Sequence, residues 1–264
     1  MSGRVAIVTG AARGIGAATA RLLAAQGWHL VLVDRCEDDP VLGYALARPE
    51  DLDAVVTACG GPDRAVGVVG DVRDQAALDA AAALAVEHFG GLDAAVAAAG
   101  CVTGGDPAWA TDEATWSTMV EVNLGGVWRL ATAAVPALLQ RPQPRTGRFV
   151  AISSMGGSVG LPLLAAYVAA KHGVNGLVRS LAAELGPEGI TANAVAPGST
   201  TTAMLDASAT VYGLADTTDL SAQHLLGRPL RADEVAEAIA WLCGEGSSGI
   251  TGVVLPVDAG ATSR

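Results

Sequence analysis

Apolar strand-like runs alternate with helical stretches along almost the whole chain, and this alternation constrains the fold more than any other feature. Each run is a short stretch rich in valine, isoleucine, leucine and alanine, typical of a strand that is buried on both faces. Strands of this kind separated by helices predict a parallel sheet covered by helices on both sides. The runs cover residues 4–9, 29–34, 65–72, 92–100, 147–154, 190–198 and 253–260.

The stretches between these runs have the periodicity of helices, and no internal repeat or linker divides the chain. We therefore predict an α/β fold: a single-domain, doubly wound parallel sheet of the Rossmann-like type, with about seven strands, over residues 1–264. The helices that we expect cover residues 14–27, 75–89, 112–139, 163–185 and 232–243.

Composition narrows the function classes. The formal net charge of -11 would repel nucleic acid phosphates and anionic lipid surfaces, so a small molecule is the expected partner. No run of about 18 apolar residues predicts a membrane span, and no signal peptide is recognised, so we expect a cytoplasmic protein. The cysteines are widely scattered, which indicates reduced buried thiols rather than a metal site or a disulfide framework. They are Cys36, Cys59, Cys101 and Cys243.

Two segments interrupt the alternation. Residues 36–48 form part of a connection longer than one short helix between strands would need, so we expect an inserted loop there. Residues 199–228 are long, rich in threonine and moderately apolar, which is typical of a lid over a substrate.

A glycine-rich turn follows the first predicted strand. Gly10, Gly14 and Gly16 stand where a strand would pass into a helix. Glycine lets the backbone approach a pyrophosphate closely, and a helix N-terminus offers free amides and a favourable dipole. The pattern predicts a dinucleotide site, although glycines also occur in such turns for packing alone.

Asp34 stands at the end of the second predicted strand, where a carboxylate would accept hydrogen bonds from the ribose diol of an adenosine. A 2'-phosphate would meet like charge there, so NAD is favoured over NADP. Arg13 and Arg35 could instead neutralise such a phosphate, or be ordinary solvated charges.

Asp71 and Val72 end the third predicted strand and could border the adenine ring, one by a polar contact and one by packing. The alternative is that Asp71 caps the helix that begins near Gln75.

Tyr167 and Lys171 are four residues apart in a predicted helix, so they share one face. Lys171 is the only lysine of the chain, which otherwise uses arginine as its cation. An ammonium beside a phenol favours the phenolate, so we expect the pKa of Tyr167 to fall from about 10 toward neutrality. Tyr167 could then act as a general base toward an alcohol, a task for which arginine's wide planar fork is less suited.

Two further polar residues complete the candidate catalytic set. Ser154 ends a predicted strand and could donate a hydrogen bond to a substrate oxygen, with Ser153 as a competitor that would instead bond backbone. Asn123 precedes two glycines within a predicted helix. It could bond backbone or water and extend a proton path from Lys171, or be an ordinary core asparagine.

These residues resemble the short-chain dehydrogenase/reductase family over nearly the whole chain. The resemblance rests on "TGAARGIG", Asp34, "DV" at 71–72, "AAAG" at 97–100, Asn123, Ser154, "YVAAK" from 167, and "PGSTTT" from 197. It implies catalytic roles for Asn123, Ser154, Tyr167 and Lys171. In "AAAG" the family commonly has two asparagines, so Ala97 and Ala98 leave the bracing of the central strands in doubt.

The resemblance also implies contacts to NAD, including nicotinamide contacts from Pro197, Gly198 and Thr202 and ribose contacts from the backbone of Ala99 and Gly100. The expected cofactor-binding set is Gly10, Arg13, Gly14, Ile15, Gly16, Asp34, Arg35, Asp71, Val72, Ala98, Ala99, Gly100, Tyr167, Lys171, Pro197, Gly198, Thr200 and Thr202.

The inserted loop is similar to one in the mycofactocin-coupled branch of the family. That similarity implies NAD that stays bound and is reoxidised in place by the peptide-derived redox carrier mycofactocin. A loop directly after Asp34 could fold over the adenosine and slow dissociation. The alternative is a surface insertion without redox consequence.

The resulting hypothesis is an oxidoreductase that moves a hydride between a secondary alcohol or its ketone and NAD. The alternatives are a family member with freely exchanging NAD and a non-catalytic NAD-binding sensor. An apolar substrate pocket is indicated by Met155, Val159, Leu161 and Trp109. As in the resembled family, the long helices at 112–139 and 163–185 could pair between subunits, which favours a homotetramer or dimer.

Overall fold

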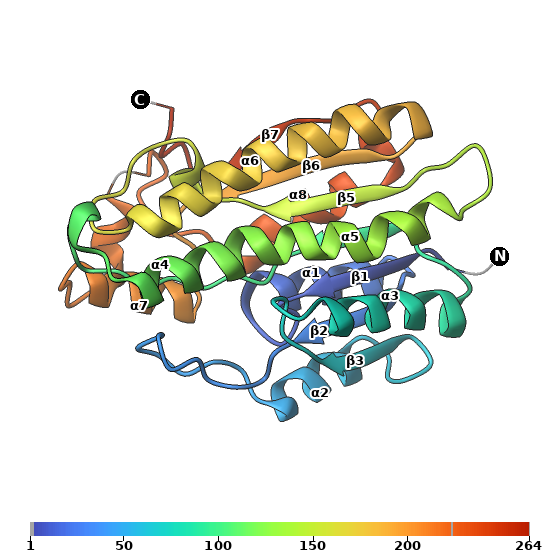
Figure 1. Cartoon of the computed structure of the whole chain (residues 1–264), viewed down its shortest axis with the longest axis horizontal. Helices are drawn as coiled ribbons and strands as arrows, with labels where there is room; N and C mark the ends of the chain where they lie inside the picture. The colour runs from blue at the N-terminus through green and yellow to red at the C-terminus, as the bar shows by residue number, and fades with distance from the viewer. Residues whose placement is uncertain (1–2, 223, 264) are drawn as a thin grey trace.

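The computed structural model describes residues 3–222 and 224–263, and within them it contains seven parallel strands in one sheet (Figure 1). Their order is β3-β2-β1-β4-β5-β6-β7, so the predicted doubly wound sheet is confirmed. The strands are β1 (Val5–Thr9), β2 (His29–Asp34), β3 (Ala65–Val69), β4 (Ala94–Ala97), β5 (Arg148–Ile152), β6 (Thr191–Pro197) and β7 (Val254–Val257).

Several strands end earlier than the apolar runs predict. The run at 65–72 ends as a strand at Val69, and the run at 92–100 ends at Ala97. The remaining apolar residues of both runs leave the sheet and line a cavity at its carboxyl edge. Apolar character continues there because the chain passes from a buried sheet to the wall of a cleft.

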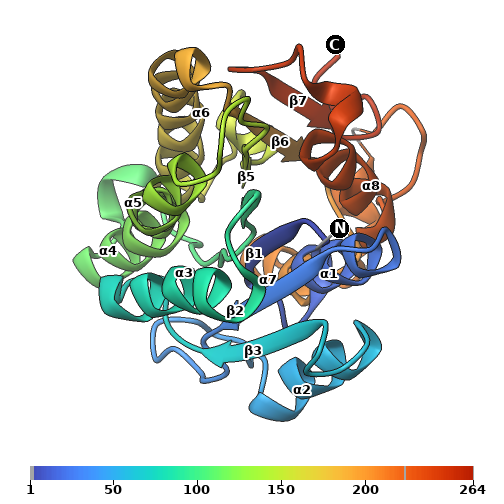
Figure 2. The ribbon, with the colours of Figure 1, turned by 90° about the vertical axis from the view of Figure 1, so that its right-hand side faces the viewer.

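Helices cover both faces of the sheet. Figure 2 shows α3, α5 and α6 on one side and α1 and α8 on the other, and each side has its own hydrophobic core. The helices are α1 (Gly14–Ala25), α2 (Pro49–Ala58), α3 (Gln75–Phe89), α4 (Glu113–Val120), α5 (Gly126–Leu139), α6 (Ala165–Leu185), α7 (Ala203–Val211) and α8 (Ala232–Cys243).

The helix predicted over 112–139 is interrupted. A π-helical turn, Glu121–Gly125, separates α4 from α5. π-turns shift the hydrogen-bond register of a helix and leave a backbone group free to bond elsewhere. Asn123 lies in this turn and is fully buried.

This same stretch corrects one expectation about membranes. The run Glu113–Leu139 is long and apolar enough to cross a membrane by length and composition alone. Half of its most apolar window is buried inside the molecule, where α5 contacts α3 and α4 contacts α6. Packing within the molecule accounts for the buried half of this apolar stretch.

The order of the strands places a crevice between β1 and β4. Successive strands β1, β2 and β3 extend the sheet to one side, whereas β4 to β7 extend it to the other. The loops that follow β1 and β4 therefore separate at the carboxyl edge, and ligands of open α/β sheets bind at this switch point. The fold itself thus indicates where the functional site lies.

Both predicted interruptions reach this edge. Residues 36–48, which we call the insertion, connect β2 to α2 without a helix or strand, and in Figure 1 this blue segment extends toward the same end of the molecule as α7. The predicted lid at 199–228 contains α7 and a short 3-10 turn, Thr217–Ser221; residue 223 lies outside the described residues.

Candidate active site

A cavity of about 720 Å³ opens over the carboxyl edge of the sheet. It is lined by the glycine-rich turn, the insertion, the loops after β3, β4, β5 and β6, and α7. Among the described residues, every predicted site residue lines this cavity except Asn123. Met155, Val159 and Leu161 line it too, but Trp109 does not and is 90% exposed, so its assignment to the pocket was wrong.

The glycines of the first turn serve two purposes. A Cβ on Gly10 would lie 2.6 Å from Ala99 Cα, and one on Gly16 would lie 2.1 Å from the Gly10 carbonyl oxygen, so these two are required by packing. Gly14 has φ +58°, and the nearest atom to a Cβ there belongs to Thr202 across the cavity, at 3.4 Å. Because no side chain caps the N-terminus of α1, its first amides face a site suited to a phosphate.

A threonine braces the central strands where the family commonly has asparagines. The Thr9 hydroxyl accepts hydrogen bonds from the backbone N–H groups of Ala98 and Ala99, each at 3.2 Å. Thr9 is 1% exposed and ends β1 beside β4. The doubt about bracing raised by Ala97 and Ala98 is thereby answered by a residue that sequence reasoning missed.

Asp34 is held rigidly at the end of β2. One carboxylate oxygen accepts from Ala12 N–H at 3.0 Å and the other from Cys36 N–H at 3.2 Å. Cys36 adopts a φ of +55°, which turns the chain sharply out of the strand. The carboxylate therefore stays beside the glycine-rich turn, where the sequence predicts the ribose diol.

Four charged side chains form a cluster next to Asp34. Asp39, which is 5% exposed, pairs with Arg35 at 2.5 Å and with Arg73 at 3.0 Å. Asp71 pairs with Arg73 at 2.7 Å and lies 3.4 Å from Arg35. Burial alone would raise the pKa of Asp39, but the Val41 amide and the two guanidinium groups hold it below its usual value. We call this set the Asp39 cluster.

The contacts of the cluster bear on two questions that the sequence left open, the roles of Arg35 and of Asp71. Arg35 is occupied by carboxylates, so it is neither a solvated charge nor free to receive a 2'-phosphate. Asp71 does not cap α3, because Asp74 accepts from Ala76 N–H instead. Asp39 and Arg73 were missed, since nothing in their spacing of 34 residues predicts a contact.

Tyr167 and Lys171 share one face of α6, and Lys171 Nζ lies 5.7 Å from the centroid of the tyrosine ring. Nζ donates to the Ile152 carbonyl at 2.8 Å. Burial lowers the pKa of Lys171 to about 8, and burial raises the pKa of Tyr167 despite the opposing hydrogen bond of Ser154. The expected fall of the tyrosine pKa is therefore not found, because burial disfavours the charged forms of both groups.

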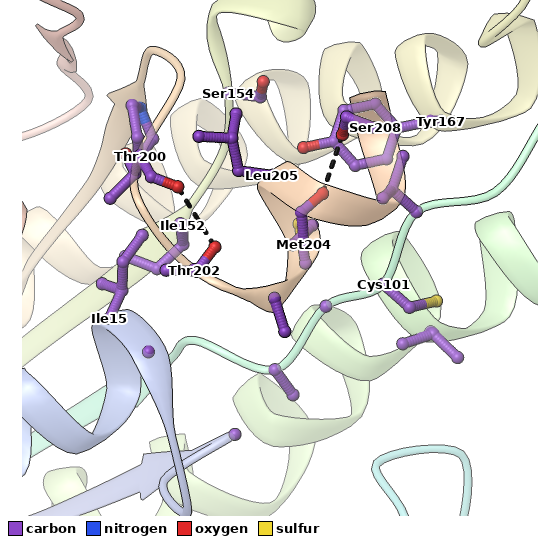
Figure 3. A pocket seen from close by; sticks show the side chains of 18 of the residues that line it. Ile15, Cys101, Ile152, Ser154, Tyr167, Thr200, Thr202, Met204, Leu205 and Ser208 are labelled. Carbon is purple, nitrogen blue, oxygen red and sulfur yellow. Dashed lines mark hydrogen bonds between the residues drawn. The ribbon is translucent and has the colours of Figure 1, made fainter. Parts of the chain in front are cut away.

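The two serines after β5 have separate roles. Ser153 donates to the Lys171 carbonyl at 3.3 Å, which is the backbone role considered for it. The Ser154 hydroxyl accepts from Gly156 N–H at 3.0 Å and lies against Tyr167, whose pKa it lowers. Figure 3 shows Ser154 and Tyr167 on the same cavity. Ser154 is thus the serine placed to meet a substrate oxygen.

Asn123 lies behind the cavity and is satisfied by backbone. Its amide nitrogen donates to the carbonyls of Cys101 and Met119, each at 3.0 Å, and its oxygen accepts from Cys101 N–H at 3.2 Å. Met119 O is the carbonyl four residues back, available because the π-turn shifts the ladder. No hydrogen bond joins Asn123 to Lys171 in the described chain, so the proton path between them stays a prediction.

Residues of the predicted lid line the opposite side of the cavity. In Figure 3, Thr200, Thr202 and Ile15 lie toward the glycine-rich turn, whereas Met204 and Ser208 lie toward Tyr167. Thr202 donates to the Thr200 carbonyl at 3.2 Å, and Thr200 donates to the Gly198 carbonyl at 3.0 Å. These bonds shape the segment after Pro197 and Gly198.

The insertion also lines the cavity. The sequence predicted that this loop could cover the adenosine, but not that it reaches the cluster around Tyr167. The Tyr44 hydroxyl accepts from Val102 N–H at 3.2 Å, and Leu42 packs on the hydrophobic cluster that contains Tyr167. The only sequence signal was the apolar and aromatic character of residues 40–47, which follow the acidic start of the loop. The insertion therefore spans from the Asp39 cluster to the catalytic residues.

Comparisons with known proteins agree in sequence and in structure. A family model described as enoyl-(acyl carrier protein) reductase matches residues 10–262. The chain is 39% identical to trans-4-hydroxycyclohexanecarboxylate dehydrogenase of Sinomonas cyclohexanicum, over 98% of this chain and 93% of the relative. It is 35% identical to (-)-trans-carveol dehydrogenase of Rhodococcus erythropolis, over 100% of this chain and 99% of the relative.

A similar solved structure is carveol dehydrogenase from Mycobacterium avium in complex with NAD. It superposes with a TM-score of 0.92 at 36% identity and covers 100% of this chain and 99% of that one.

Proposed function

The chain belongs to the short-chain dehydrogenase/reductase family, and from this premise we propose that it oxidises apolar secondary alcohols to ketones on NAD that stays bound between turnovers. The oxidoreductase class and the use of NAD are those of its relatives. The observation that carries the proposal is the meeting of Ser154, Tyr167 and Lys171 at the end of a cavity that begins at the glycine-rich turn.

The residues present fit NAD. The uncapped first turn of α1 and the positive φ of Gly14 suit a pyrophosphate, and the rigid carboxylate of Asp34 suits a ribose diol. Arg35 is tied to Asp39 and Asp71, so no unpaired guanidinium in the Asp39 cluster favours a 2'-phosphate over that diol.

Each side chain of the site then has its own role in the oxidation of the alcohol. NAD, when bound, supplies the carbon that accepts a hydride. Because burial raises the pKa of Tyr167, the tyrosine must pass its own proton on, to Lys171 or to solvent, as it takes the proton of the substrate hydroxyl. Ser154 donates a hydrogen bond to the oxygen on which charge develops. Lys171 exchanges a proton with this pair, since its lowered pKa of about 8 lets it do so near neutral pH. Asn123 positions Cys101 and the adjoining wall.

The insertion is our reason for proposing a retained cofactor. It is fixed at one end by the Asp39 cluster and at the other by the bond from Val102 N–H to Tyr44. A loop held at both ends opens less often than a free one, so it slows the escape of whatever it covers. Reoxidation in place by mycofactocin is the finer part of this proposal and rests on the similarity of the insertion.

One experiment on the purified protein separates the two cofactor hypotheses. The protein is denatured, and released NAD is measured by absorbance and mass; activity on secondary alcohols is then compared with an artificial electron acceptor and with added NAD alone. Near-stoichiometric NAD with turnover only on the acceptor supports retention. Full turnover on added NAD would show an ordinary family member with exchanging cofactor.

A substitution tests the catalytic assignment. Tyr167→Phe should remove turnover while the same amount of NAD is released on denaturation, because only the hydroxyl is lost. Substantial remaining activity would refute the role of Tyr167. A variant without activity and without NAD would indicate a folding defect, which circular dichroism detects.

We also propose a cytoplasmic homotetramer. Trp116 on α4 and Trp128 on α5 are 44% and 53% exposed, and a second copy would cover such a surface. Light scattering coupled to size exclusion reads the mass directly, and a monomer would end this part of the proposal.

A further inference from the structure

The wall around the catalytic tyrosine is apolar and comes from separate parts of the chain. Tyr167 lies in a hydrophobic cluster with Val102 and Leu164. Partly buried side chains from the insertion and from α7 pack on that cluster, among them Leu42 and Met204. A substrate carbon skeleton placed beside Tyr167 would therefore contact mainly hydrocarbon.

The cations that line the cavity either pair with other groups or lie at the glycine-rich turn. Among the described residues they are Arg13, Arg35, Arg73 and Lys171. Arg35 and Arg73 are paired with carboxylates of the Asp39 cluster, and Lys171 donates to a backbone carbonyl. Arg13 belongs to the glycine-rich turn.

The described part of the lid adds a charge of the opposite sign. Its one charged residue in the lining is Asp219. A substrate carboxylate at this end would lose its hydration, find no described side-chain cation of its own, and share the cavity with that acid.

We propose that the catalytic end accepts uncharged, apolar alcohols and rejects alcohols that carry a carboxylate, and that Leu42 and Tyr44 of the insertion form the wall that sets this selectivity. The inference rests on the proposed function and names its substrate class. It separates two kinds of alcohol that relatives of this chain are named for, carveol and a hydroxycyclohexanecarboxylate.

Tyr44 suits an uncharged wall. Its hydroxyl is engaged by the Val102 amide, and burial raises the pKa of Tyr44 to about 12, so the side chain stays neutral. A neutral phenol offers a carboxylate no compensating charge, so the apolar part of the insertion serves mainly as a surface for hydrocarbon.

The test uses two substrates that differ in charge and by one methyl group: trans-4-hydroxycyclohexanecarboxylate and its methyl ester. The ring and the hydroxyl are the same, so the ratio of their kcat/KM values reports what the cavity does with a carboxylate. We expect the ester to be favoured at least about 100-fold, since burying an unpaired charge discriminates far more than a change of size does. Equal values, or a preference for the acid, would overturn the proposal.

Two variants of the insertion test whether Leu42 sets the preference. Leu42→Lys places an ammonium in the wall and should raise the acid-to-ester ratio at least about 10-fold. Ala45→Lys adds the same charge three residues away, at an exposed position outside the lining, and should leave the ratio unchanged. The same ratio in both variants would remove Leu42 from the assignment.

A binding measurement keeps this inference separate from the proposed function. Cyclohexanecarboxylate and its methyl ester carry no hydroxyl, so their effect on the melting temperature does not depend on catalysis. Stabilisation by the ester and not by the acid supports the proposal even if no alcohol is turned over. Equal or greater stabilisation by the acid, or none by the ester, would contradict it even in an active enzyme.

Discussion

Lys171 stands one turn after Tyr167 on α6, with Nζ 5.7 Å from the tyrosine ring centroid, yet its hydrogen bond goes to the Ile152 carbonyl. Both side chains are more than nine-tenths buried. Burial lowers the pKa of the lysine to about 8 and raises that of the tyrosine, so the charged form of each is disfavoured. The fold thus holds the only lysine of the chain where its charge opposes stability.

Replacing this lysine should change how stability depends on pH. Above its folded pKa of about 8 the native lysine has lost its proton, while the lysine of the unfolded chain keeps it up to its ordinary pKa of 10.5. Stability of the wild type should therefore rise with pH across this window, by about 2 kcal/mol relative to Lys171→Met between pH 7 and about pH 9.5.

Urea unfolding of both proteins at the two pH values measures this difference. The loss of the hydrogen bond to Ile152 does not affect the comparison, because the variant lacks this bond at both pH values. Parallel changes in the two proteins would mean that the pKa of Lys171 is not lowered. The variant should also be inactive, which would identify the lysine as a residue kept for function at a cost to stability.

The Asp39 cluster should control cofactor retention. Asp39→Asn keeps the shape of the side chain but leaves Arg35 and Arg73 with one fewer carboxylate, so we expect a loss of about 1–3 kcal/mol and a faster release of NAD. The guanidinium groups thereby freed should also improve the affinity for NADP relative to NAD. NAD released on denaturation and its rate of exchange with labelled NAD give the readout.

Asp38→Asn is the matched control for this substitution. Asp38 pairs with Arg48 at a site where both side chains are 49% exposed, and the amide oxygen of asparagine can still accept from Leu46 N–H, so the substitution should cost little stability. If both variants release NAD at the same rate, the Asp39 cluster does not hold the insertion.

The hydroxyl of Thr9 should contribute more to the stability of the fold than its small size suggests. Thr9→Val keeps the volume but leaves the N–H groups of Ala98 and Ala99 without this acceptor, and we expect about 1–3 kcal/mol of lost stability. In the control Thr19→Val the lost hydroxyl only bonds back to Ile15 O within α1, so the effect should stay below about 1 kcal/mol. Denaturant unfolding compares the two, and equal losses would contradict a bracing role for Thr9.

The sheet was predictable because buried parallel strands leave a strong local signal. Runs such as "HLVLVD" and "RVAIVT" became β2 and β1 nearly as predicted. The shared helix face of Tyr167 and Lys171 was predictable for a related reason, since helical spacing is local. The predicted fall of the Tyr167 pKa was wrong, because that pKa depends on burial by segments distant in the sequence.

Long-range contacts of common residue types could not be predicted. Asp39 lies in "CEDDP", which reads as a solvated acidic loop, yet Arg73 from another connection buries it. The π-turn had a partial signal, the two glycines after Asn123, but the bond from Asn123 to Met119 O that accompanies it had none. Thr9 looked like an ordinary strand end until Ala98 and Ala99 were placed against it.

Gly100 should tolerate no side chain, although its backbone is not strained. A Cβ there would lie 3.0 Å from Asn123 Oδ1 and 3.6 Å from Lys171 Nζ, so the methyl group of Gly100→Ala would stand against both. Asn123 cannot yield freely, since its oxygen accepts from Cys101 N–H. We expect kcat to fall about 10- to 100-fold, because displacements well below 1 Å already misplace a catalytic group.

Steady-state kinetics and released NAD measure this effect, and the bound cofactor should change less than kcat does. The control is Gly186→Ala at the end of α6, where a Cβ would meet nothing within 4 Å. If Gly100→Ala behaved like this control, the space between Asn123 and Lys171 would not need to stay empty, and Asn123 would lose its place in the catalytic set.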